Sequence, residues 1–301
     1  MDFKKIQTYP IIKRRNKFSI DQMISPGSKV SFYSKELEIV ADRIKKARGL
    51  GRPIIVMMGG AVIKDGCSLL LIDLMEKGYI TFLAMNGSVS IHDFEIALIG
   101  KTSEDVQSSL KDGSFGMADE TGRYMNSAIN KGYAEGLGYG EAVALEIDRL
   151  DLPYKNYSII HRAHALGVSA SVHVAIGGDI IHQHPDCSGA ALGATSFEDF
   201  RKFTEAIAGL DNGVIINIGS AVIMPEVFLK ALTISINLGH RYTSFTVANF
   251  DFLEMYRPKT RVIEWPKALG AQGYNVLGRH NQTIPKLHEL LVPQTFKNIT
   301  G

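Results

Sequence analysis

The segment from 213 to 226 (GVIINIGSAVIMPE) constrains the fold more than any other part of the chain. Its apolar run predicts a strand covered on both faces of a parallel sheet. Gly219 and Ser220 then predict a small-residue turn, and Pro225 suits the first turn of a following helix. Such a unit offers backbone N–H groups and a helix dipole to an anion such as phosphate. It is equally compatible with a tight turn that binds nothing.

A second copy of this unit lies nearer the N-terminus, at 53–66 (PIIVMMGGAVIKDG). Its Gly-Gly-Ala-Val-Ile at 59–63 corresponds to Gly-Ser-Ala-Val-Ile at 219–223, and Lys64 follows directly. If both strands belong to one parallel sheet, the two turns lie at the same edge and border one crevice. The alternative is two ordinary strand–helix units.

Predicted strands and helices alternate along the whole chain. Strands are expected at about 53–58, 80–85, 170–176, 213–218 and 243–248, and helices at about 34–48, 66–76, 91–99, 119–131, 140–149, 157–166, 197–209 and 285–291. This alternation predicts an α/β fold with a mostly parallel sheet and helices on both faces. We expect a single domain over 1–301, with an extended N-terminal arm at about 1–33 and a C-terminal wrapping tail at about 256–301.

Composition limits the partners that we expect. A chain of 301 residues with 45% hydrophobic content can bury a full core, and its net charge of +2 gives no electrostatic reason to bind nucleic acid. We interpret the short basic group at 13–17 as a solvated arm. No signal peptide is recognisable, and no apolar stretch approaches the roughly 18 residues that span a membrane. We therefore expect a cytoplasmic protein with no membrane partner, and free thiols at the distant Cys67 and Cys187.

Small polar turns follow each predicted strand and would meet at one edge of the sheet. They are Gly59-Gly60, Asn86-Gly87-Ser88, Gly177-Gly178-Asp179, Gly219-Ser220 and Ala248-Asn249. Together they would line a crevice of nucleotide size. Neither the Gly-x-Gly-x-x-Gly fingerprint nor a Gly-Lys-Ser/Thr loop is present, so the residues alone do not establish a nucleotide site.

Histidines are concentrated in one part of the chain. Five of the nine, interleaved with Asp179 and Asp186, are His161, His164, His173, His182 and His184. Imidazoles and carboxylates at this density suggest a metal, but the recognised spacing signatures are absent, which favours a polar substrate pocket or hydrogen-bonded loop histidines. A zinc or iron site on an extended His182-x-His184 pair is the alternative, but no standard spacing fixes a third ligand. We therefore predict no metal site.

Acidic residues also open the helix expected near 91–99, as His92-Asp93-x-Glu95. Carboxylates at a helix start are stabilised by the dipole and could bind a ribose hydroxyl or a cationic amine. The alternative is that Asp93 only caps the helix.

The order of these motifs resembles the deoxyhypusine synthase family. The resemblance covers most of 50–255 and rests on order and spacing, because each motif is individually loose. It is carried by Asn86-Gly87-Ser88 with the acidic residues after it, by Ala175-Ile-Gly-Gly-Asp179, by the unit at 213–223 and by Thr246-Val-Ala-Asn249.

The resemblance implies a Rossmann-like NAD-binding sheet in a homotetramer or dimer, with active sites between paired subunits. In that family NAD takes a hydride from spermidine, and a lysine captures the aminobutyl group as an imine before passing it to a translation factor. Carried over, the acidic residues Asp93, Glu95 and Asp179 would lie near the amine or the ribose. As our own hypothesis we assign catalytic roles to Asp179, His182 and Lys64, with a histidine from the 161–184 cluster as general base. Asp93, His173 and His184 would contact a polyamine-like substrate. NAD would be bound by Gly59, Gly60, Asn86, Gly87, Ser88, Glu95, Gly178, Gly219, Ser220 and Asn249.

One position departs from the family. The imine-forming lysine should follow two aliphatic residues after the glycine-rich turn, but Ile223 or Met224 stands there. We hypothesise that Lys64, at the matching place of the first copy, supplies an amine; a surface or phosphate-pairing lysine is the alternative. We therefore predict a deoxyhypusine-synthase-like, NAD-dependent enzyme that takes hydride from a small amine. The alternatives are a metal-dependent hydrolase using His182, His184 and Asp186, and a non-catalytic NAD-binding protein.

Overall fold

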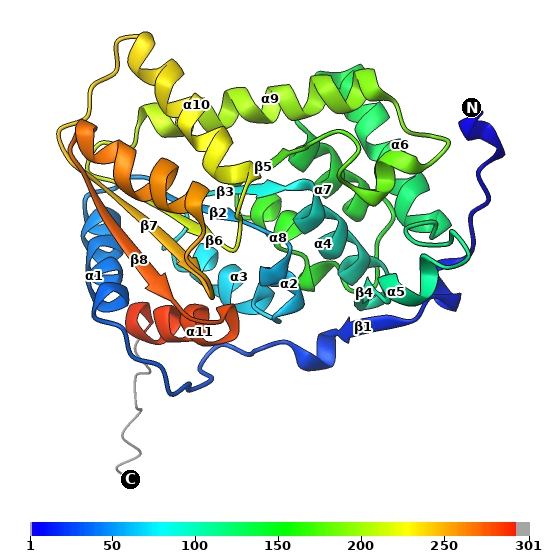
Figure 1. The fold of residues 1–301 in the computed structure, drawn as a ribbon, viewed down its shortest axis with the longest axis horizontal. Helices are drawn as coiled ribbons and strands as arrows, with labels where there is room; N and C mark the ends of the chain where they lie inside the picture. The colour runs from blue at the N-terminus through cyan, green and yellow to red at the C-terminus, as the bar shows by residue number, and fades with distance from the viewer. Residues whose placement is uncertain (1, 293–301) are drawn as a thin grey trace.

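The computed structural model describes residues 2–292 and contains a six-stranded parallel sheet between helices (Figure 1). This confirms the predicted α/β fold class. The strands are β1 (Asn16–Ser19), β2 (Ile54–Met58), β3 (Phe82–Asn86), β4 (Lys101–Glu104), β5 (Ser169–His173), β6 (Val214–Ile218), β7 (Phe245–Asp251) and β8 (Ala271–Leu277). The helices are α1 (Lys35–Gly49), α2 (Ala61–Lys64), α3 (Ser68–Glu76), α4 (Gly87–Ile99), α5 (Val106–Ser109), α6 (Asp119–Glu135), α7 (Tyr139–Arg149), α8 (Ile159–Ala165), α9 (Gly189–Ala208), α10 (Ile223–Asn237) and α11 (His280–Leu291).

The order of the strands in the main sheet is β5-β3-β2-β6-β7-β8. The chain runs outward from β2 through β3 to β5, returns to β6 beside β2, and then runs outward the other way to β8. This is the doubly wound, Rossmann-like arrangement, in which ligands bind outside the carboxyl ends of the strands where the direction reverses. Here that switch point lies between β2 and β6, the two copies of the strand–turn unit, which pair in parallel from Ile54↔Val214 to Met58↔Ile218.

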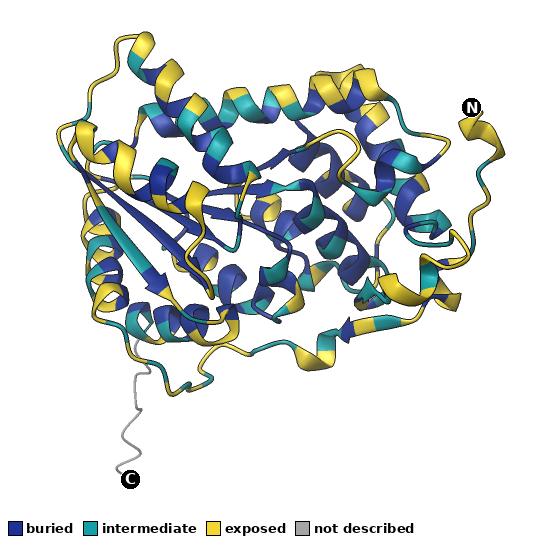
Figure 2. Ribbon diagram, viewed as in Figure 1, coloured by how far each residue is buried: buried dark blue, intermediate teal, exposed yellow. Residues whose placement is uncertain are grey.

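Helices cover both faces of the sheet and leave its strands buried (Figures 1 and 2). α1, α3 and α11 pack on one face with the side chains of Ile54, Val56 and Met58. α9, α10 and the π-helical segment η6 (Pro258–Glu264) cover the other face, where Ile55 and Met57 lie. Because side chains alternate along a strand, burial of every residue of β2 requires both layers.

A helical region between β3 and β5 extends the molecule beyond the edge of the sheet (Figure 1). Helices α4, α6, α7 and α8 pack against one another there. The N-terminal arm runs along this region, and its strand β1 pairs antiparallel with β4. This pairing ties the arm to the residues that follow α4.

Two segments differ from the sequence prediction. Residues 271–277 form β8, although we expected only a wrapping tail there; part of that tail, 293–301, lies outside the described residues. β8 escapes a search for apolar runs because it is an edge strand with several exposed side chains. The long loop that we expected at 177–196 ends at Ser188, because α9 begins at Gly189 with small residues that carry little hydrophobic periodicity. Among the residues described, no helix is long and apolar enough to cross a membrane.

Candidate functional site

The turns after β2, β3, β5 and β6 touch one another along the carboxyl edge of the sheet. A Cβ atom on Gly59 would overlap the carbonyl oxygen of Gly219, and one on Gly87 would overlap the Asp179 carboxylate. A Cβ atom on Gly60 would lie 2.6 Å from Ser88 Oγ. Four of the turns expected at one edge therefore form a close-packed row, which we call the glycine row (Gly59, Gly60, Gly87 and Gly219). A ligand at this edge would lie across the row.

Unpaired polar atoms lie beside the glycine row at the switch point. Gly219 has a φ of 64°, and a Cβ atom there would lie 2.5 Å from Nε2 of His280. His280 is 2% exposed, and neither of its ring nitrogens has a hydrogen-bond partner among the described residues; the same holds for Oδ1 of the buried Asn217. Because buried polar atoms are normally paired, these atoms fit the polar groups of a bound nucleotide.

The adjoining helix start is compatible with a nucleotide phosphate. α10 begins at Ile223, three residues after Ser220, and runs for 15 residues. Ser220 Oγ accepts a hydrogen bond from the Met224 N–H at 3.2 Å and so occupies one of the N–H groups at this helix start. Backbone N–H groups at a helix start favour anions.

A cavity of about 250 Å³ adjoins the glycine row, and we call it the carboxyl-edge cavity. Five of the predicted site residues line it, namely Lys64, Ser88, Glu95, Gly178 and Asp179. The remaining lining residues are Arg14, Ile91, His92, Ser103, Glu104, Val106, Phe115 and Ile180. Two cations and three carboxylates give the lining a net charge of −1 when all are ionised. The cavity therefore favours a small cationic ligand with an aliphatic part.

Among the described residues, two carboxylates of this cavity have no Lys or Arg within ion-pair distance, and one of them, Glu104, accepts hydrogen bonds from the Tyr9 hydroxyl and the Gly116 N–H. Asp179 is the other. Its side chain is 11% exposed, and burial raises its pKa from 3.8 to about 6. A buried carboxylate of this kind pays a desolvation cost that a bound ammonium group would reduce.

His182 lies beside Asp179, and its Nδ1 is used as a hydrogen-bond acceptor by the backbone. Its Nδ1 accepts hydrogen bonds from the backbone N–H groups of Gly177 (3.1 Å) and Asp179 (3.2 Å). A neutral ring with an accepting Nδ1 carries its proton on Nε2, and that atom lies 3.8 Å from Asp179 Oδ2. At that distance Nε2 makes no hydrogen bond, and it has no partner among the described residues. The basic nitrogen of His182 is thus occupied, so His182 is not placed as the general base that we expected.

The basic group of the N-terminal arm is not wholly solvated, contrary to our expectation. Arg14 is 7% exposed, and its guanidinium donates to both carboxylate oxygens of Glu95 at 2.6 and 2.7 Å. Glu95 also accepts from Thr102 Oγ1 at 2.6 Å and from Thr121 Oγ1 at 3.0 Å. With four donors on its two oxygens, Glu95 has no acceptor capacity left for the ribose that the resemblance assigned to it.

His92, which was not among the predicted site residues, forms part of the cavity wall. Its Nδ1 lies 2.8 Å from Thr102 Oγ1. Burial lowers its pKa from 6.5 to about 4, so the ring is neutral at physiological pH. Its position one helical turn before Glu95 on α4 is the sequence signal that could have identified it.

Several predicted substrate or cofactor residues have structural partners. Asp93 is fully buried and caps α8, accepting from Ser158 Oγ (2.5 Å) and the N–H groups of Ile159 and Ile160; burial raises its pKa to about 6. The alternative interpretation was that Asp93 only caps its own helix. Asp93 does act as a cap, but of the neighbouring helix α8. Asn86 caps α4 by accepting from the Val89 N–H.

Two further predicted residues lie within the packed interior. His173 packs edge-on against Phe200 and Phe203, and burial lowers its pKa to about 3. Asn249 donates to Asn275 Oδ1 at 3.0 Å and accepts from Asn217 Nδ2 at 2.8 Å, which links β6, β7 and β8. Neither residue lines the carboxyl-edge cavity.

The histidine-rich segment does not converge on a metal. His182 lies in the 3-10 helix η5 (Ile180–Gln183), not on an extended strand, and His184 Nε2 hydrogen-bonds to the Gly116 carbonyl oxygen at 2.8 Å. Asp186 is exposed. Within residues 2–292, no three His, Cys, Asp or Glu side chains are grouped to hold a metal ion. The geometry therefore gives no support to the metal-dependent hydrolase.

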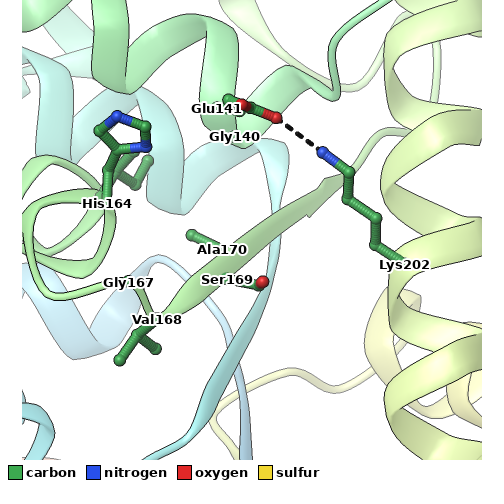
Figure 3. Close-up of a pocket in the computed structure, with 9 residues that line it drawn as sticks. Gly140, Glu141, His164, Gly167, Val168, Ser169, Ala170 and Lys202 are labelled. Atoms are coloured by element: carbon green, nitrogen blue, oxygen red, sulfur yellow. Dashed lines mark hydrogen bonds and ion pairs between the residues drawn. The ribbon is translucent and has the colours of Figure 1, made fainter.

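A second cavity, of about 240 Å³, lies at the amino end of β5 (Figure 3). We call it the amino-edge cavity, and its lining is Gly140, Glu141, Ile160, His164, Gly167, Val168, Ser169, Ala170 and Lys202. Lys202 Nζ and Glu141 Oε2 form an ion pair at 2.7 Å across its mouth (Figure 3). None of the predicted site residues lines it.

Comparison with known proteins supports the fold but does not assign a family. No protein-family model matches the chain, and no curated protein sequence matches it. Among solved structures, a protein assigned as a deoxyhypusine synthase from Entamoeba histolytica is similar, with a TM-score of 0.55, 10% identity, and coverage of 95% of this chain and 96% of that one.

Two larger enzymes are similar over part of their length. ArgZ, an arginine dihydrolase from the ornithine–ammonia cycle in cyanobacteria, matches with a TM-score of 0.52 and 17% identity over 89% of this chain. AgrE, solved with ornithine and NAD+, matches with a TM-score of 0.51 and 13% identity over 87% of this chain. The chain spans about a third of each, covering 34% of both. At these identities the likeness establishes a shared Rossmann-like fold.

Proposed function

We propose that the protein is a deoxyhypusine-synthase-like, NAD-binding enzyme that removes hydride from a small cationic amine. The observation that carries this proposal is the negatively charged carboxyl-edge cavity beside the glycine row, which would bring an amine next to a nucleotide. The ligands named for AgrE, ornithine and NAD+, support the same pairing of an amine with this cofactor.

NAD would be held across the switch point. Gly59, Gly60, Gly219 and Ser220 would lie under it, and the unpaired ring nitrogens of His280 would meet its polar groups. When bound, NAD supplies the acceptor for a hydride. The fit rests on the close glycine contacts and on the buried polar atoms without protein partners.

The amine would bind in the carboxyl-edge cavity through Asp179. Its carboxylate attracts an ammonium group, and the apolar side chains of Val106, Phe115 and Ile180 would contact the aliphatic part. Hydride leaves an amine carbon more readily once the ammonium group has lost a proton. Asp179 Oδ2 is the acceptor that we propose for this proton, because a pKa of about 6 brings its basicity closer to neutral pH than that of an ordinary carboxylate.

Lys64 completes the proposal. It ends α2 and lines the same cavity as Asp179. In a transfer reaction its deprotonated amine would attack the carbon of the oxidised substrate, forming a new C–N double bond and releasing the original amine. If the reaction is a simple oxidation, Lys64 instead sets the charge of the cavity.

The test is a binding and turnover experiment on purified protein. NAD at a hundredfold excess over its Kd should stabilise the fold by about 2.7 kcal/mol in a thermal-shift titration. Spermidine or ornithine added to the NAD complex should then raise the absorbance of reduced nicotinamide. Binding of both without reduction would identify the non-catalytic alternative, and absence of any NAD shift would refute the proposal.

We also propose a homo-oligomer, a tetramer or dimer, formed at the carboxyl edge. Ile176, Val222 and Phe252 follow β5, β6 and β7 and are 67%, 46% and 62% exposed. Burying such side chains against a second subunit would be favourable. Sedimentation equilibrium of the wild type and of Phe252→Asp tests this: a monomeric wild type refutes it, and dissociation of the variant supports it.

A further inference from the structure

The carboxyl-edge cavity contains one histidine whose protonated nitrogen can be assigned from its hydrogen bonds. His92 Nδ1 contacts Thr102 Oγ1, and Thr102 contacts the buried Glu95. We propose that Thr102 is a positioning residue that keeps the proton of His92 on Nδ1, so that Nε2 is free to accept a hydrogen bond from an ammonium group in the cavity. The second part of this inference rests on the proposed amine function, whereas the first does not.

The direction of each hydrogen bond follows from Glu95. Both oxygens of Glu95 accept from the guanidinium of Arg14 in a bidentate ion pair, and a carboxylate in such a pair only accepts. Thr102 therefore donates its single hydroxyl proton to Glu95 Oε2 at 2.6 Å. Its oxygen can then only accept from His92, at 2.8 Å, so Nδ1 carries a proton. In the neutral ring, Nε2 consequently has a free lone pair.

The orientation of the His92 ring directs Nε2 away from Thr102. The Nδ1 edge of His92 faces Thr102, and the opposite edge faces the glycine row, since a Cβ atom on Gly60 would lie 3.1 Å from Cδ2. Within residues 2–292, Nε2 has no hydrogen-bond partner. His92 and Asp179 both line the cavity, so two acceptors are available to one ligand.

Burial, together with the charges around the His92 ring, keeps the ring neutral. Burial is the main cause of the lowered pKa of His92; Lys64 and Arg14 lower it further, and Glu95 opposes them. Asp179 and Glu104 are the other carboxylates of the cavity. A neutral imidazole can accept a hydrogen bond from an ammonium group. A protonated ring has no free lone pair and would repel the ammonium group.

The structure provides a matched pair of variants. Thr102 and Thr121 are both fully buried, and each donates one hydrogen bond to Glu95. Only Thr102 also contacts His92. Thr102→Val and Thr121→Val should therefore weaken the Glu95 cluster to a similar degree, but only Thr102→Val removes the acceptor for Nδ1–H. Thr102→Ser keeps the hydroxyl and should restore the wild-type state.

The experiment is nitrogen NMR of the histidine rings in the full-length protein, followed by calorimetric titration with spermidine in the presence of NAD. We expect the Nδ1–H tautomer of His92 in the wild type, Thr121→Val and Thr102→Ser, and a mixture of tautomers in Thr102→Val. Affinity for spermidine should fall about tenfold in Thr102→Val alone, which is about 1.4 kcal/mol or one hydrogen bond.

Three outcomes would overturn the inference. They are an Nε2–H tautomer in the wild type, an unchanged tautomer in Thr102→Val, and equal losses of affinity in both valine variants. If the wild type binds no amine although its tautomer is Nδ1–H, the amine function and the acceptor role of Nε2 are refuted, while the assignment of Thr102 as the tautomer-fixing residue stands.

Discussion

The carboxyl-edge and amino-edge cavities are nearly equal in size and differ in how their charges are arranged. The carboxyl-edge cavity has about 250 Å³ and the amino-edge cavity about 240 Å³. At the amino edge, the charges of Glu141 and Lys202 neutralise each other, and both side chains are about one-third exposed. At the carboxyl edge, the buried Arg14–Glu95 pair is also neutral, but Asp179 and Glu104 have no cationic partner among the described residues, and Glu104 is compensated by hydrogen bonds from Tyr9 and Gly116. An uncompensated buried charge, rather than volume, therefore marks the candidate site.

The largest expected effect tests the buried ion pair. Arg14→Ala should leave the Glu95 carboxylate buried without its cation, which typically costs 3–5 kcal/mol. We expect a loss of roughly that size in the free energy of unfolding, measured by urea denaturation. Arg15 is exposed, so Arg15→Ala is the matched control and should change stability little. Similar small effects in both variants would mean that Arg14 is as solvated as its neighbour.

The next effect tests whether Asp179 binds the ligand. Asp179→Ala should weaken amine binding by about a hundredfold, which is about 2.7 kcal/mol, because the cavity loses its unpaired carboxylate. NAD binding should be retained, since the switch point is untouched. Glu141→Ala removes a carboxylate from the other cavity and should leave amine affinity unchanged in the same calorimetric assay. Undiminished turnover of Asp179→Ala would refute the role of Asp179.

The sequence was sufficient to predict five of the six strands of the sheet and the edge at which their turns meet. Continuous apolar runs such as 54–58 and 214–218 are needed where a strand is buried on both faces, so they identify central strands directly. Parallel strands then bring their terminal turns to one edge. For this reason Lys64, Ser88 and Asp179, which are far apart in the chain, could be expected near one another.

The Arg14–Glu95 pair could not be predicted in the same way. The two residues are 81 positions apart, and their contact depends on the antiparallel pairing of β1 with β4, which are short strands without a strong apolar pattern. The role of His92 was missed for a related reason. Which nitrogen carries its proton depends on the hydrogen bond from His92 to Thr102 and on that from Thr102 to Glu95, and these become visible only in three dimensions.

The third prediction is a gain in stability, expected when the charge of Asp179 is removed. Burial raises the pKa of Asp179 from 3.8 to about 6, so the folded state favours the neutral acid. Above pH 6 the ionised carboxylate therefore destabilises the wild type, and this cost disappears as the pH falls from 6 towards 3.8. Asp179→Asn should be more stable than the wild type at neutral pH by on the order of 2 kcal/mol.

The pH dependence of that difference is the control. Urea denaturation of both proteins should show the gain above pH 6 and its loss near pH 4, where the wild-type carboxyl is protonated as well. Asp93 and Asp199, whose pKa values are also raised by burial, are present in both proteins and cancel in the comparison. A gain that is independent of pH would attribute the effect to packing instead of charge.

The smallest expected effect lies in the amino-edge cavity. Lys202→Met removes the cation of a pair whose side chains are 33% and 36% exposed, and such pairs contribute about 0–1 kcal/mol because water screens both charges. We expect a change of that size in urea denaturation and unchanged binding of NAD and amine. The outcome bears directly on Arg14→Ala: if the exposed pair proved as costly to break as the buried one, burial would not be what distinguishes the two cavities. A loss of amine binding in Lys202→Met would move the candidate site to the amino end of β5.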